Sequence, residues 1–262
     1  MKQLHTYLFF ISLLVSGTIL SQEETNISAR DTLPPAEKYG LRVGVDLARF
    51  VRSAVNDDYS GFEINADYRV YRNYYVAAEI GNESLERNEA NINVEGSGSY
   101  IRFGLDYNTY KNWYGMQNNI YAGLRYGFSA FNQTLNSYSI FTGTDYYIPI
   151  NPETGEPDLS MDPNLRSNPV EVKDLTAGWV ELVLGLKVEV LNNLYLGASV
   201  SLRGLVSEKD PVGVVTIDGD KRSIQFENLF IPGYGRTNDF SQFGVGYNYT
   251  ISYLIPFTKK KR

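Results

Sequence analysis

Residues 243–255, with the sequence FGVGYNYTISYLI, alternate between two unlike sets of side chains. One set is aromatic or aliphatic: Phe243, Val245, Tyr247, Tyr249, Ile251, Tyr253 and Ile255. The other set is small or polar: Gly244, Gly246, Asn248, Thr250 and Ser252. Successive side chains of a β-strand point to opposite faces of a sheet, so this period of two predicts a strand with one apolar and one polar face.

Seven earlier segments show the same alternation and no helical period. They cover residues 39–47, 61–70, 74–81, 101–107, 119–128, 179–189 and 194–203. Eight such segments predict an all-β protein, and an even strand number suits an antiparallel sheet that closes on itself.

The connections between these segments alternate in length. Three are tight and carry an Asn that suits a hairpin turn; they are 71–75, 110–114 and 191–195. The other four are longer, at about 51–58, 84–98, 132–175 and 207–239. We therefore expect all tight turns and both termini at one end of the sheet, and all long loops at the other.

The alternation alone fits either a soluble sandwich or lipocalin-like barrel, or a membrane barrel with its apolar face outward. Glycine weakens a solvated strand, but it makes room for large neighbours inside a narrow barrel. Eleven glycines occupy the polar face: 40, 44, 61, 81, 104, 123, 127, 185, 197, 244 and 246. Aromatic residues gather near the tight turns, where an interfacial girdle is expected: Tyr71, Tyr74, Tyr110, Trp113, Tyr114, Tyr195 and Phe257. These features favour the membrane barrel.

The N-terminus is typical of an exported protein. Residues 1–21 combine Lys2, a short apolar core and small residues, as a secretory signal peptide does. We interpret 22–38 as a flexible periplasmic leader, 39–257 as the transmembrane barrel and 258–262 as a basic periplasmic tail. The predicted location is the outer membrane of a Gram-negative cell.

At this point the chain resembles the small eight-stranded outer-membrane barrels, the group that includes the OmpA transmembrane domain and OmpX. The resemblance covers about residues 39–257 and rests on strand number, loop asymmetry and the last strand, which ends on Ile255-Pro256-Phe257. It implies recognition of that strand by the barrel assembly machinery during insertion. The tail from Thr258 to Arg262 departs from the family, whose members usually stop at the aromatic residue. More narrowly, the chain is similar to uncharacterised exported barrels described only as a domain of unknown function.

The composition excludes several classes of catalytic and metal site. The chain has no Cys, and its one His is His5, inside the predicted signal peptide. His-based triads, Cys nucleophiles, disulfides and ordinary zinc sites are therefore excluded from the exported part. The net charge of −6 argues against a nucleic-acid partner. We predict no enzymatic activity, no catalytic residues, no cofactor and no metal.

The polar face carries thirteen charged residues, nearly balanced in sign. The acidic positions are Asp46, Glu63, Asp67, Glu79, Asp106, Glu181 and Glu189, and the basic ones are Arg42, Arg69, Arg102, Arg125, Lys187 and Arg203. Side chains fill the interior of an eight-stranded barrel, and an unpaired buried charge is costly. We therefore predict a salt-bridge plug. The alternatives are a narrow polar path and, less well supported, a carboxylate pair for acid–base chemistry.

The function predicted from the sequence is a non-enzymatic outer-membrane barrel that binds something at its surface or has a structural role. Its partners are the surrounding outer-membrane lipid and an extracellular ligand or protein at loops 132–175 and 207–239, since long loops on a rigid scaffold commonly carry binding sites. The alternatives are a narrow channel or transporter for small solutes, and a lipid hydrolase or acyltransferase.

Overall fold

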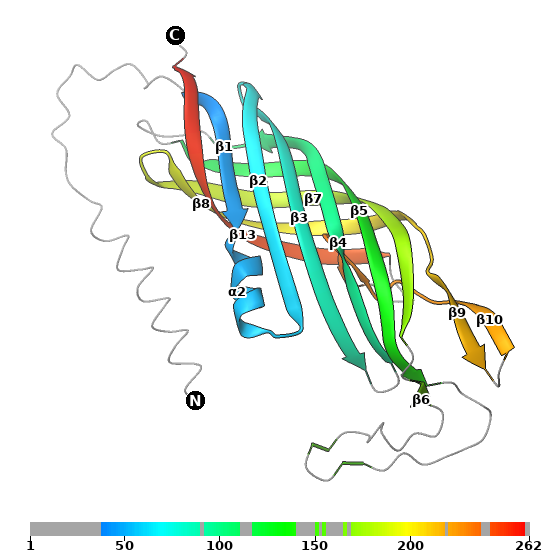
Figure 1. The fold of residues 1–262 in the computed structure, drawn as a ribbon. Helices are drawn as coiled ribbons and strands as arrows, with labels where there is room; N and C mark the ends of the chain where they lie inside the picture. The colour runs from blue at the N-terminus through cyan, green and yellow to red at the C-terminus, as the bar shows by residue number, and fades with distance from the viewer. Residues whose placement is uncertain are drawn as a thin grey trace, which may run out of the picture. The chain divides into compact units, whose positions relative to one another are not determined.

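In the computed structural model, antiparallel strands make up most of the chain (Figure 1). The structure describes residues 38–89, 92–110, 117–139, 150–151, 154–155, 165–166, 169–217, 220–236 and 242–259. The predicted signal peptide and all of the predicted leader except Lys38 lie outside these ranges. Eight long strands form the main sheet: β1 (Lys38–Asp46), β2 (Tyr59–Tyr71), β3 (Tyr74–Glu89), β4 (Ile92–Asn108), β5 (Asn119–Ser139), β7 (Val170–Leu191), β8 (Leu194–Glu208) and β13 (Phe243–Lys259).

These eight strands close into a ring. Each pairs with the next along the chain, and β13 returns to pair with β1, with Gly44 opposite Ser252. All pairings in the ring are antiparallel. The prediction of an all-β antiparallel sheet is confirmed. The first and last strands extend slightly beyond the predicted 39–257, from Lys38 to Lys259.

The two faces of the ring are chemically opposite, as the alternation predicts. Large apolar side chains cover the outside; Leu184, for example, is 60% exposed. The charged side chains point inward, and Glu63 has no exposed surface. Large inward side chains lie over glycines: a Cβ on Gly127 would lie 2.1 Å from the Trp179 ring.

The connections differ in part from the prediction. The turns Arg72-Asn73 and Asn192-Asn193 are two residues long, and positive φ angles occur at Arg72 and Asn193. The third predicted tight turn, 110–114, is part of a longer connection between Asn108 and Asn119, and residues 111–114 lie outside the described residues. The predicted loop 84–98 is wrong, because β3 and β4 stay paired as far as Glu89 and Ile92. The ends of the predicted loop 132–175 are likewise strand, in β5 and β7. The alternation was not seen there because the outward positions become polar.

A helix that the sequence interpretation missed follows β1. Helix α2 (Leu47–Val55) begins at Asp46, whose carboxylate accepts a hydrogen bond from the Ala48 amide at 2.9 Å. Leu47 was expected to continue the strand and instead begins the helix. No helix in the described ranges is long and apolar enough to cross a membrane.

The connection between β8 and β13 is structured in two parts. A hairpin forms within the predicted loop 207–239 from β9 (Val212–Ile217) and β10 (Asp220–Gln225). After it, residues 226–236 contain the short pair β11 (Phe230–Ile231) and β12 (Gly235–Arg236). Ile231 is fully buried and packs with Tyr100, Leu175 and Trp179. We call residues 226–236 the plug segment. A two-residue strand, β6 (Leu165–Arg166), pairs with the end of β5.

Candidate functional site

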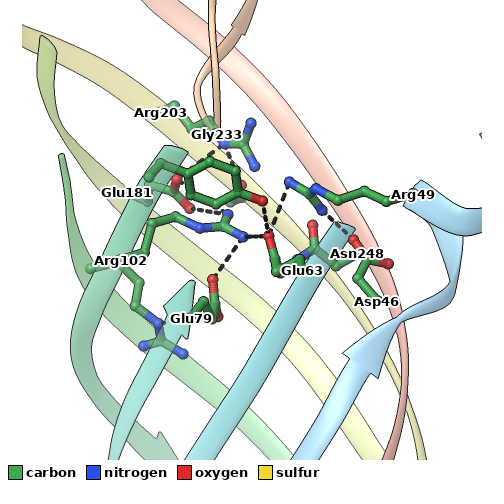
Figure 2. A network of polar contacts seen from close by, with 12 residues as sticks. Asp46, Arg49, Glu63, Glu79, Arg102, Glu181, Arg203, Gly233 and Asn248 are labelled. Carbon is green, nitrogen blue, oxygen red and sulfur yellow. Dashed lines mark hydrogen bonds and ion pairs between the residues drawn. The ribbon is translucent and has the colours of Figure 1, made fainter. Parts of the chain in front are cut away.

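Arg102 is the centre of a buried charge network within the ring (Figure 2). Its guanidinium contacts Glu63 on β2, lies 2.8 Å from Glu79 on β3 and lies 3.5 Å from Glu181 on β7. Arg203 on β8 reaches the same Glu181 at 3.2 Å. One arginine therefore links carboxylates from three strands and ties opposite walls of the ring together.

A second arginine enters the network from helix α2. Arg49 contacts Asp46, and its guanidinium lies 3.1 Å from Glu63 and 3.0 Å from Glu83. Arg49 and Glu83 are both buried, and neither was predicted as a site residue. The helix therefore contributes a cation that the strand alternation alone could not place.

Other ion pairs lie nearer the tight turns. Arg42 is 2.8 Å and Lys187 is 2.5 Å from Asp67. Arg125 is 2.6 Å from Asp106 and 3.6 Å from Glu79. Glu79 thus joins this group to the network around Arg102.

The structure places all thirteen predicted interior charges on the inner face, and eleven of them join these ion pairs: Arg42, Asp46, Glu63, Asp67, Glu79, Arg102, Asp106, Arg125, Glu181, Lys187 and Arg203. The remaining two bond to the turn backbone. Arg69 donates to the Arg72 carbonyl, and Glu189 accepts from the Asn193 amide at 2.8 Å. These two residues fix the turns rather than the central network.

The neutral groups around the network are also hydrogen-bonded to it. Tyr100 donates to Glu63, which accepts a second bond from the Asn248 amide at 3.0 Å. The Trp179 indole donates to Glu181 at 2.6 Å. Asn248 reaches the Glu63 oxygen that faces neither arginine, while Tyr100 and Trp179 share oxygens with the arginines. The carboxylates are thus hydrogen-bonded as buried charges require.

The plug segment covers the network at the end away from the tight turns. The Gly233 amide donates to Glu83 at 2.7 Å, and Arg203 donates to the Tyr234 carbonyl at 2.7 Å. Burial raises the pKa of the Tyr234 phenol above its ordinary value. On this side an apolar layer, which the plug segment shares with β4, β5 and β7, lies over the charges.

Only some of the predicted girdle residues lie on the outer face. Tyr71, Tyr74 and Phe257 are exposed on the outer face, and Tyr110 is partly exposed. Trp113 and Tyr114 lie outside the described residues. Tyr195 is not a girdle residue: it is 1% exposed, and Arg42 lies 4.7 Å from its ring centre. Its strand position points inward although it is next to a turn.

The arrangement has the chemistry of a structural network. Every carboxylate at its centre faces at least one guanidinium. Across the described ranges, no group of three or more His, Asp or Glu side chains is placed to hold a metal ion.

Comparison with known protein families identifies the family to which the chain belongs. Residues 4–260 match the model of a domain of unknown function, DUF6048. The chain belongs to this family. A search of curated proteins found no match to the DUF6048 chain. The resemblance to OmpA and OmpX remains a hypothesis based on the strand pattern.

Proposed function

We propose that this DUF6048 protein is a non-enzymatic outer-membrane β-barrel with a sealed, charge-filled interior. The observation that carries the proposal is the closed ring with an apolar outside and a charged inside. This is the reverse of a soluble barrel. Over the length of β1, where the ring is closed, no strand edge is left open, as lipid requires. The outward apolar positions of β7 run from Val180 to Val190, which matches the roughly 9–11 residues of a tilted bilayer crossing.

The rest of the proposal follows from this orientation. The exposed Tyr71, Tyr74 and Phe257 would lie at the lipid–water interface, as girdle residues do. The long connections would then face the extracellular side, where we place a ligand or protein partner at the connections from β5 to β7 and from β8 to β13. The barrel assembly machinery would insert the chain, with β13 as its recognised strand.

A closed barrel should survive detergent at room temperature and open only on heating. We expect the purified chain, without its signal peptide, to run at different positions on a gel before and after boiling. The unboiled sample should also co-float with lipid vesicles after refolding. Identical bands and no flotation would contradict the membrane barrel.

A conductance measurement distinguishes the sealed barrel from the alternative, a narrow channel. The described cavity beside Asp67 and Lys187 has a volume of only about 20 Å³, close to that of one water position. In planar bilayers we therefore expect no steady openings from the wild-type chain, with an open porin as the positive control. Steady, reproducible openings would favour transport of small solutes.

A further inference from the structure

The ring has one gap, because β1 is shorter than its neighbours. At the end away from the tight turns, its last partners are Ile64 on β2 and Thr250 on β13. Beyond them, residues 59–63 of β2 pair only with β3, and residues 243–249 of β13 pair only with β8. No described strand lies between these two edges.

Helix α2 covers the β2 side of this gap. Ser53 accepts a hydrogen bond from the Gly61 amide at 2.9 Å, and the rings of Phe50 and Phe62 meet edge to face at 5.4 Å. The helix exposes further apolar side chains, including Val51 and Val55. The helix thus continues the apolar outer surface of the ring across the gap.

The β13 side is less well covered. The Tyr249 amide points into the gap, where it donates to Asp46 at 3.3 Å. Because direction alternates along a strand, the backbone groups of Tyr247 and Val245 point the same way. No described strand pairs with Tyr247 or Val245 on that side. Their backbone N–H and C=O groups therefore face the gap.

A cavity of about 310 Å³ lies at this place, between α2, β13 and the plug segment. Its outer rim is apolar: Val245 is 68% exposed and Tyr247 is 64% exposed. Its inner wall is charged and carries Arg49, Arg52 and Arg203 with Glu83. The volume lies at the lower end of the range for ligand sites.

The arginines at the inner wall have capacity left for an anion. Arg52 stacks on the Tyr59 ring at 3.7 Å and forms no ion pair with a described residue. Arg203 uses Nε and Nη1 for Glu181, Ser201 and Tyr234, while its Nη2 lies beside Gly246 in the cavity wall. Arg203 is buried, so an anion there would meet a positive charge that water screens weakly.

We propose that this cavity binds an anionic amphiphile. Its carboxylate or phosphate head would contact Arg52 and Arg203, and its acyl chain would leave past Val245 and Tyr247 between α2 and β13. The path of the chain rests on the proposed function, because it assumes that the outer surface faces lipid. The head-group site itself does not.

The test is binding to the folded full chain, without its signal peptide, in non-ionic micelles. Radiolabelled dodecanoate and dodecyl phosphate should bind at one site per chain, and the tighter of the two tells whether a fatty acid or a phospholipid head is preferred. Dodecanol and inorganic phosphate should each bind at least tenfold more weakly, because each lacks one half of the recognised chemistry. The proposal would be overturned if dodecanol or inorganic phosphate bound as tightly as the anionic amphiphiles. It would also be overturned if neither dodecanoate nor dodecyl phosphate bound.

Two pairs of variants locate the site. Gly244→Leu should reduce affinity at least tenfold by filling the cavity, since a Cβ there is tolerated at 3.5 Å from Tyr234. Gly204→Leu, on the outer face of β8, is the matched control and should bind as wild type. Arg52→Gln should weaken both anionic ligands, and Arg52→Lys should restore part of the loss.

The gel-mobility test establishes that each variant is folded before binding is measured. Wild-type affinity in Gly244→Leu or Arg52→Gln would overturn the proposal. If the chain binds dodecanoate but does not insert into vesicles, the head-group site survives and the membrane assignment fails. If it inserts but binds neither anionic amphiphile, the membrane assignment survives alone.

Discussion

Replacing Leu184 by arginine is expected to destabilise the lipid-inserted chain by about 2–4 kcal/mol. Leu184 lies near the middle of the outward apolar positions of β7, and its side chain is 60% exposed. In water, a charge at an exposed position would cost little. In a membrane the same charge must either leave the hydrocarbon or draw water into it, so the size of the effect reports the surrounding solvent.

The measurement is reversible urea unfolding in lipid vesicles, followed by tryptophan fluorescence. The control is Val214→Arg on hairpin strand β9, which is also exposed but lies outside the ring. This control should change the unfolding free energy by less than about 0.5 kcal/mol, as most surface substitutions do. An unchanged midpoint for Leu184→Arg would show that Leu184 does not face lipid.

The sequence predicted the ring well where every second side chain is apolar. In β7, the alternation from Val180 to Val188 identifies both faces without further information. It failed in the upper parts of β3 and β4, where the outward positions become polar, as at Asn82 and Ser84, and apolar side chains such as Leu85 turn inward. A period of two is visible only when the two faces meet unlike surroundings.

Helix α2 could have been predicted. Asp46 is a favourable N-cap, and Leu47, Phe50, Val51 and Val55 recur at helical spacing. The segment is short, and Leu47 also fits the alternation of the preceding strand. The pattern therefore predicted a strand through Leu47 and no helix after it. Arg49 was missed together with the helix that carries it.

The partners within the charge network could not be read from the sequence. The alternation of side chains along a strand predicts that Glu63 and Arg102 point inward. Which arginine or lysine pairs with which carboxylate depends on strand register and on the loops. Gly233 and Glu83, for example, are 150 residues apart and meet only because the plug segment folds into the ring. The gap beside α2 likewise depends on where β1 stops pairing, which composition does not reveal.

The largest loss of stability is expected from Arg102→Met. The substitution keeps a long, flexible side chain but leaves Glu63, Glu79 and Glu181 without the cation that they share. Removing one partner of a buried ion pair typically costs about 3–5 kcal/mol, because the remaining charge stays desolvated. The unfolding midpoint in vesicles at neutral pH should fall accordingly.

Two comparisons distinguish this electrostatic cost from lost packing. Lys173→Met removes a cation from an exposed pair with Glu171 and should cost no more than about 1 kcal/mol. Adding Glu63→Gln to Arg102→Met removes one of the stranded charges, so the double variant should be more stable than Arg102→Met alone. Additive losses in the double variant, or an unchanged midpoint for Arg102→Met, would mean that water enters the ring and screens these charges. In that case the interior would be a hydrated path rather than a seal, and the narrow channel would become the better interpretation.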